Sequence, residues 1–346
     1  MEKTFIENRD KRNLEKSEIL LSSLPPYCKR YFDSLQTKTS TLTQFNYIND
    51  LKIFFYYLTT KVFKGANTVK ISPEQLSSLK YYHFEAYLNW LSFYTLDDKD
   101  YKNSLNGKAR KLASLKSFFN YLYKNDIINS NEISKVDSPK IHEKDIIRLE
   151  PNEVVDVLDE VEHPRHLSIQ NQKYISKLNV RDLAIMYLFL GTGIRISELV
   201  GLDLNDFNFE ENAFRITRKG GNKAIMYFPS ETKDFLLNYY NERINLKPLD
   251  GHTNAFFLST QMKRISVRAV ENLVKKYTKN VVNLKNITPH KLRSTFGTNL
   301  YRETQDIYIV ATMLGHKDVN TTKKHYAAIT EDQKRETALK DVKLKK

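Results

Sequence analysis

The stretch Gly191-Thr192-Gly193-Ile194-Arg195-Ile196-Ser197-Glu198-Leu199 follows an apolar run over residues 181–190. The run predicts a helix, and the two glycines predict its end, because glycine readily adopts the left-handed conformation found just beyond helix C-termini. Ile196 and Leu199 then predict a second helix that begins at once. We therefore expect Arg195 at the start of a helix, directly after a tight turn.

Two later segments place further polar side chains at predicted helix ends. Thr288-Pro289 is typical of an N-cap followed by proline in the first turn. His290 and Arg293 share one face of that helix, at the positive end of its dipole, which suits a phosphate. Leu314-Gly315-His316 predicts a helix C-terminus with a left-handed glycine, and the helix after it carries Tyr326. Each segment taken singly also fits an ordinary surface helix, and most tyrosines are half-buried packing residues.

Together these segments supply two arginines, two histidines and a tyrosine. Two guanidinium groups can clamp one phosphate, and a phenol beside them can attack it. The set fits phosphoryl transfer on a nucleic-acid backbone without a metal. Between them, the alternating segments 213–217 and 224–229 predict a β-hairpin. Its turn carries three cations, Arg218, Lys219 and Lys223.

Composition favours a folded, DNA-associated protein. The chain has 346 residues, enough for two domains, and a net charge of +14 from 55 basic and 41 acidic residues. Such a charge favours nucleic acid as the partner, then an anionic membrane surface, although a simply soluble basic protein also fits. The one cysteine, Cys28, excludes an internal disulfide and fits a reducing compartment. We find no signal peptide and no apolar run of the roughly 20 residues that span a membrane. We therefore expect a cytoplasmic protein without membrane insertion.

The pattern along the chain predicts an α+β fold that is mainly α. We expect an N-terminal lead-in over 1–37, a helical bundle with a basic side over 38–130, a linker over 131–149 and a mixed domain with a small antiparallel sheet over 150–346, which carries the candidate catalytic residues. Apolar residues recur at helical spacing over 42–58, 81–93 and 108–124, and no strand is expected before residue 200. The cations expected to face DNA are Lys108, Arg110, Lys111 and Lys116 on the third helix, with Arg218 and Lys223 on the hairpin.

Several other chemistries lack the residues they need. The histidine groups at 163–166 and 316–325 have no cysteine pair or acidic partner to complete a metal site, so we expect no metal. The glycines at 191–193 lack the lysine and spacing of a phosphate-binding loop, and we expect no cofactor. Serine hydrolase and paired-carboxylate motifs are also missing.

The combined segments resemble the tyrosine recombinases, and most closely the Xer branch in the form that works with a single recombinase. The likeness covers about residues 38–335. It comprises the first-arginine box at 181–202, the lysine hairpin around Lys219, the His-x-x-Arg box at 287–300 and the Leu-Gly-His box with the tyrosine at 309–326. The order and spacing of the four boxes are specific, whereas each box alone is weak.

The resemblance implies a role for each matching residue. Arg195 and Arg293 would hold the non-bridging oxygens of the scissile phosphate, and Tyr326 would attack the phosphorus to form a 3′-phosphotyrosine. The 5′-hydroxyl released from one strand would then attack the phosphotyrosine of the partner. Because the ester conserves the bond energy, neither ATP nor a metal is needed.

The remaining boxes imply the proton transfers. Lys219 would protonate the leaving 5′-hydroxyl, although Lys223 in the same hairpin is the alternative. His290 would assist proton transfer at the tyrosine, and His316 would hydrogen-bond the phosphate. The residue after Arg293 departs from the common Xer pattern, with Ser294 where a histidine is frequent.

The likeness also implies an assembly. We expect a homotetramer on two short inverted-repeat sites in double-stranded DNA, acting through a Holliday junction. The expected role is resolution of chromosome dimers at a dif-like site during cell division, with a septal DNA translocase as a further partner. A mobile-element integrase, a non-catalytic DNA-binding regulator and a type IB topoisomerase remain alternatives. The tail from residue 331 is expected either to dock on a neighbouring protomer or to be a solvated terminus.

Overall fold

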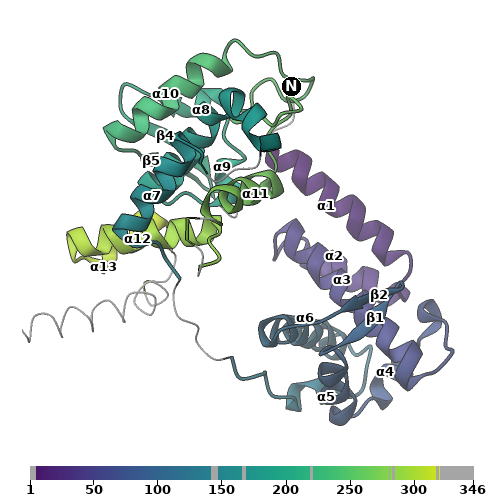
Figure 1. Ribbon diagram of the computed structural model, residues 1–346. Helices are drawn as coiled ribbons and strands as arrows, with labels where there is room; N and C mark the ends of the chain where they lie inside the picture. The colour runs from purple at the N-terminus through teal and green to yellow at the C-terminus, as the bar shows by residue number, and fades with distance from the viewer. Residues whose placement is uncertain are drawn as a thin grey trace, which may run out of the picture. The chain divides into compact units, whose positions relative to one another are not determined.

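The computed structural model describes residues 5–141, 147–165, 169–218, 221–279, 281–282, 285–316 and 319. The chain divides into two compact units, Met1–Lys144 and Asp145–Lys346 (Figure 1). The predicted α+β, mainly helical fold is confirmed. No helix among the described residues has the length and apolar character to cross a membrane.

The first unit is a helical bundle with one short hairpin. Its longer helices are α1 (Phe5–Leu21), α2 (Pro26–Leu35), α3 (Thr41–Tyr57), α5 (Tyr81–Trp90) and α6 (Leu105–Lys124). Its shorter elements are the π-helical turn Leu58–Val62, the 3-10 turns Thr68–Lys70 and Glu132–Lys135, α4 (Pro73–Ser78), β1 (Tyr94–Leu96) and β2 (Lys99–Tyr101). Helix α3 begins where the sequence predicts, since the Ser40 side chain accepts a hydrogen bond from the Thr43 N–H.

The residues expected to form a polar lead-in are helical and contribute to the core. Helix α1 packs along α3, and α2 buries Tyr27, Tyr31 and Phe32 in the same apolar cluster as α3 and α6. The Tyr31 ring meets Phe118 edge-on, with centroids 5.2 Å apart. The bundle is therefore completed by residues that precede its predicted start.

The β1–β2 hairpin corrects the expectation of no strand before residue 200. Its strands are three residues long, too short for an alternating pattern to be visible. Asp97 and Asp98 form the two-residue turn with φ of 51° and 58°, which aspartate tolerates better than most residues. Tyr94 and Tyr101 face each other across the strands with ring centroids 5.3 Å apart.

The second unit surrounds helix α8 (Ile169–Thr192). Its other helices are α7 (Pro151–Glu162), α9 (Ile196–Leu199), α10 (Ser230–Arg243), α11 (Val267–Thr278), α12 (Pro289–Thr304) and α13 (Ile307–Leu314). A 3-10 turn, Leu204–Asp206, leads into the antiparallel sheet of β3 (Phe207–Asn208), β4 (Ala213–Thr217) and β5 (Lys223–Tyr227). The predicted hairpin is thus present, and Ala255 and Leu258 make isolated β-bridges with Asp203 and Arg264.

Helix α8 is held on several sides, which fixes the turn at its C-terminal end. It packs against α7, α10 and α12, and Ile185, Met186 and Phe189 are fully buried. The buried Asp182 carboxylate accepts hydrogen bonds from the Tyr277 hydroxyl at 2.8 Å and the Lys276 ammonium at 3.1 Å, both on α11. The next turn of chain is therefore positioned by a rigid helix.

Candidate active site

The turn after α8 is in close contact with α12 and α13. Gly193 has φ of +62°, as the sequence predicts for a left-handed residue, whereas Gly191, also expected at the helix end, lies within α8. A Cβ on Gly193 would lie 2.4 Å from Cδ1 of Phe296 on α12 and 3.0 Å from Cδ2 of Leu314 on α13. Only glycine therefore allows the three segments to approach this closely.

Arg195 is fixed by a residue that the sequence analysis did not select. The Arg195 main-chain N–H donates to Glu198 Oε2, and its Nη1 donates to Glu198 Oε1, both at 2.9 Å. The Glu198 side chain is 3% exposed, and that of Arg195 is 36% exposed. The sequence does contain a signal for this contact. Glu198 lies three positions after the N-cap residue Arg195, and an acidic residue at that position can accept a hydrogen bond from the N-cap N–H.

Arg293 reaches the same turn from α12. The residue is 5% exposed, and its Nη1 donates to the Gly193 carbonyl while its Nη2 donates to the Leu314 carbonyl. Arg195 Nη2 donates to the next carbonyl, that of Gly315, at 3.1 Å. The two arginines, 98 positions apart in the sequence, thus bind adjacent carbonyls and lie side by side.

The two predicted histidines lie one helical turn before Arg293 and one residue after Gly315 in the chain. Gly315 caps α13 with φ of +61°, and the half-buried His316 follows it, its N–H donating to the Ala311 carbonyl at 2.9 Å. His290 is exposed in the first turn of α12, one turn before Arg293. The predicted general acid Lys219 and the predicted nucleophile Tyr326 lie outside the described residues.

The geometry suits an anion. Two guanidinium groups meet at the adjacent carbonyls of Leu314 and Gly315, and Arg195 is the N-cap residue of the short helix α9. A guanidinium has five N–H donors, so contacts with carbonyls leave capacity for phosphate oxygens. Within the described residues, no group of three histidine, cysteine or acidic side chains could hold a metal ion.

The cations expected on α6 differ in their surroundings. Arg110 donates to both oxygens of Asp50, at 2.6 and 2.8 Å, and its side chain is 47% exposed. The Lys108 ammonium donates to Ser92 Oγ at 2.7 Å, and that of Lys116 donates to the Val136 carbonyl at 2.6 Å.

Lys111 corrects the sequence interpretation. It is 5% exposed, and its ammonium lies 3.0 Å from the fully buried Asp50 carboxylate. It is therefore an interior ion-pair partner and has no surface from which to contact DNA. Its position on the apolar face of α6, one residue before Leu112, gave no sign of the aspartate on α3.

The two hairpin cations also differ. Lys223 is exposed at the start of β5. Arg218 is half-buried, and its guanidinium lies against Gly315, where an added Cβ would be 2.0 Å from Nη1. The hairpin therefore meets the arginine site through Arg218.

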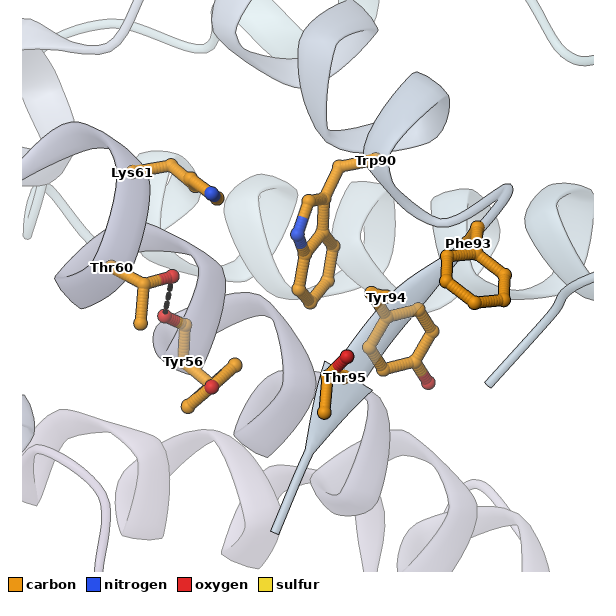
Figure 2. A pocket seen from close by; sticks show the side chains of 7 residues that line it. All are labelled: Tyr56, Thr60, Lys61, Trp90, Phe93, Tyr94 and Thr95. Carbon is orange, nitrogen blue, oxygen red and sulfur yellow. Dashed lines mark hydrogen bonds between the residues drawn. The ribbon is translucent and has the colours of Figure 1, made fainter. Parts of the chain in front are cut away.

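A separate pocket of about 360 Å³ lies in the first unit. Figure 2 shows its lining, with the Trp90 indole beside Tyr94 and the Lys61 side chain extending toward the indole. The Trp90 and Tyr94 ring centroids are 4.4 Å apart, and the Thr60 hydroxyl donates to the Tyr56 carbonyl. The pocket shares no residue with the arginine site.

Comparison with known proteins identifies the family of the chain. The phage integrase family model matches residues 148–333. A tyrosine recombinase XerC of Caldanaerobacter subterraneus subsp. tengcongensis is 32% identical over 328 residues, which cover 90% of this chain and 84% of that protein. A tyrosine recombinase XerS of Streptococcus agalactiae is 30% identical over 349 residues, covering 93% and 97%. The chain belongs to the phage integrase family, in the Xer branch of the tyrosine recombinases, and is a tyrosine site-specific recombinase.

Solved structures show the same fold. The XerH recombinase bound to a palindromic difH substrate has a TM-score of 0.63 at 19% identity, covering 87% of this chain and 80% of that one. The Tn1549 transposon integrase in complex with circular intermediate DNA has a TM-score of 0.61 at 19% identity, covering 86% and 94%. The predicted recombinase architecture is confirmed.

Proposed function

We propose that this recombinase cuts and rejoins double-stranded DNA at a short inverted-repeat site through a 3′-phosphotyrosine intermediate and a Holliday junction. The observation that supports this most directly is the meeting of Arg195 and Arg293 at the adjacent carbonyls of Leu314 and Gly315. Two forked donors at one place match the two non-bridging oxygens of a phosphodiester.

Each of the six predicted site residues has a separate role in the proposed reaction. Arg195 and Arg293 hold the phosphate, and His316 hydrogen-bonds one of its oxygens as negative charge develops. The Tyr326 phenol attacks phosphorus, its proton passing with help from His290, and the P–O5′ bond breaks. Lys219 donates the proton that the leaving 5′-oxygen needs. A 5′-hydroxyl from the partner duplex then attacks the phosphotyrosine. A new P–O5′ bond forms, the bond to Tyr326 breaks, and the exchanged strands are joined.

A half-site substrate that traps the cleaved state tests the nucleophile. The wild type is expected to form a covalent adduct with DNA, and Tyr326→Phe is expected to form none. Tyr308→Phe is the matched control, because Tyr308 is 69% exposed on α13. Equal adduct from the wild type and Tyr326→Phe would show that the nucleophile is another residue.

The choice between Lys219 and Lys223 has its own test. Replacing the bridging 5′-oxygen by sulfur gives a leaving group that needs no proton. Cleavage by Lys219→Ala is therefore expected to recover on the sulfur substrate, and Lys223→Ala is expected to cleave both substrates like the wild type. Recovery of Lys223→Ala alone would reverse the assignment.

For the biological role, we propose resolution of chromosome dimers at a dif-like site by a homotetramer in the cytoplasm, with a septal DNA translocase as activator. The XerC and XerS relatives support this role over mobile-element integration. The fold does not discriminate, since the XerH and Tn1549 structures match almost equally. Genomic DNA captured by Tyr326→Phe is expected to contain one chromosomal palindrome. Enrichment of element ends would favour the integrase.

A further inference from the structure

Arg218 differs from the other partly buried arginines of the second unit. Arg181 is paired with Asp182 at 2.6 Å, Arg302 is paired with Glu150 at 3.0 Å, and Arg264 is paired with Asp203. Within the described residues, the Arg218 side chain has no ion pair and no hydrogen bond, and its Nε is buried without a partner. A half-buried guanidinium in this state is poorly solvated, so an anion would stabilise it.

The position of Arg218 is set by its main chain. Its N–H donates to the Asn222 carbonyl at 2.8 Å, and its carbonyl accepts from the Gly221 N–H at 3.1 Å. These bonds continue the β4–β5 ladder, in which Thr217 pairs with Lys223. The base of the hairpin therefore fixes the main chain from which the Arg218 side chain extends.

The side chain ends at the phosphate site. A Cβ on Gly315 would lie 2.0 Å from Arg218 Nη1, 2.2 Å from Cζ and 2.8 Å from Nη2. The carbonyl of the same glycine accepts from Arg195, and the preceding carbonyl accepts from Arg293. Guanidinium groups from three separate segments thus meet at two consecutive residues.

We propose that Arg218 is a third guanidinium of this anion site and binds a phosphate oxygen of the DNA at the point of cleavage. The inference rests on the proposed function and deepens it, because it assigns a substrate contact to the residue that precedes the predicted general acid. Phosphate binding by Arg218 also places the end of β4 beside the scissile group.

Three substitutions separate charge from packing. Arg218→Met keeps much of the volume over Gly315 and removes the charge, whereas Arg218→Lys keeps the charge and removes the planar fork. Arg215→Met is the matched control, because Arg215 lies on β4 and its exposed guanidinium donates to the Asn205 carbonyl at 2.9 Å. Each methionine variant loses one positive charge from the same strand region.

Two measurements on the full chain test the proposal. The first is the single-turnover rate of adduct formation on the half-site substrate at saturating protein. Arg218→Met is expected to slow it about 100- to 1,000-fold, the range for loss of one donor that stabilises charge in a transition state. Arg218→Lys should fall between that variant and the wild type, and Arg215→Met should match the wild type.

The second measurement is binding of inorganic phosphate to the DNA-free protein at constant ionic strength. The readout is the change in melting temperature as phosphate is added. The rise in melting temperature with phosphate is expected to be lost in Arg218→Met and kept in Arg215→Met. Adduct rates or phosphate binding that are the same in the two methionine variants would overturn the proposal. If the wild type binds phosphate through Arg218 but forms no Tyr326-dependent adduct, the anion site is supported and the proposed function is contradicted.

Discussion

Glu198→Gln tests whether the buried carboxylate positions Arg195. The carboxylate accepts two hydrogen bonds from Arg195, both at 2.9 Å, one from the main chain and one from the guanidinium. The glutamine amide has nearly the same shape, but it is uncharged and its single oxygen can accept only one of the two bonds. A hydrogen bond to a charged group contributes about 1.5–3 kcal/mol. At about 1.36 kcal/mol for each factor of ten, the cleavage rate is expected to fall about 10- to 150-fold.

The assay is adduct formation on the half-site substrate under single-turnover conditions, with DNA affinity measured in parallel. Glu271→Gln is the matched control, because Glu271 also lies three residues after an arginine, Arg268, at 3.4 Å, but both side chains are well exposed. DNA affinity should change little, since surface cations supply most of it. Equal cleavage rates for the two glutamine variants would refute the idea that Glu198 orients Arg195.

Three further predictions concern stability and packing. Asp50→Asn is expected to destabilise the first unit by about 3–5 kcal/mol, because the buried Lys111 ammonium loses its counter-charge. Urea unfolding followed by the fluorescence of Trp90, the one tryptophan, measures this, and adding Lys111→Met should recover most of the loss. Gly315→Ala is expected to slow cleavage more than Gly251→Ala. Both have positive φ, but only a Cβ on Gly315 meets Arg218, so equal rates would count against that contact. Burial raises the pKa of Glu150, but Arg302 and Arg148 outweigh it and leave the pKa below its usual value. This stabilisation is therefore present above the unfolded carboxyl pKa and is lost as pH falls, so urea unfolding at neutral and acid pH should show a smaller pH effect in Glu150→Gln.

Local signals were enough to predict most helix ends around the site. Gly193 and Gly315 both have the left-handed conformation that their positions after apolar runs indicated, and Pro289 begins α12 after Thr288. These features depend on the conformational preferences of one or two residues. They can be recognised in the sequence without knowledge of what packs against them.

Features that depend on distant partners were not predictable in the same way. Lys111 is one of several cations along α6, and the sequence does not show that Asp50 on another helix pairs with it in the interior. Arg218 was expected to contact DNA as a hairpin cation, and nothing in the hairpin sequence shows that Gly315 leaves space for its guanidinium. The short β1–β2 hairpin was missed because three residues cannot display a period.

The meeting of Arg195, Arg218 and Arg293 at residues 314–315 depends both on local conformational preferences and on contacts between distant residues. The left-handed turn at Gly193 is local, but its packing against Phe296 and Leu314 depends on the glycine having no side chain. Arg293 then joins the Gly193 and Leu314 carbonyls with the two ends of one planar group, a bridge that an ammonium cannot make in the same geometry. The residue that holds the turns together is therefore also a phosphate ligand in the proposed reaction, and assembly of the fold creates the anion site. Because the site is preorganised in this way, DNA binding need not supply the free energy to bring the guanidinium groups together.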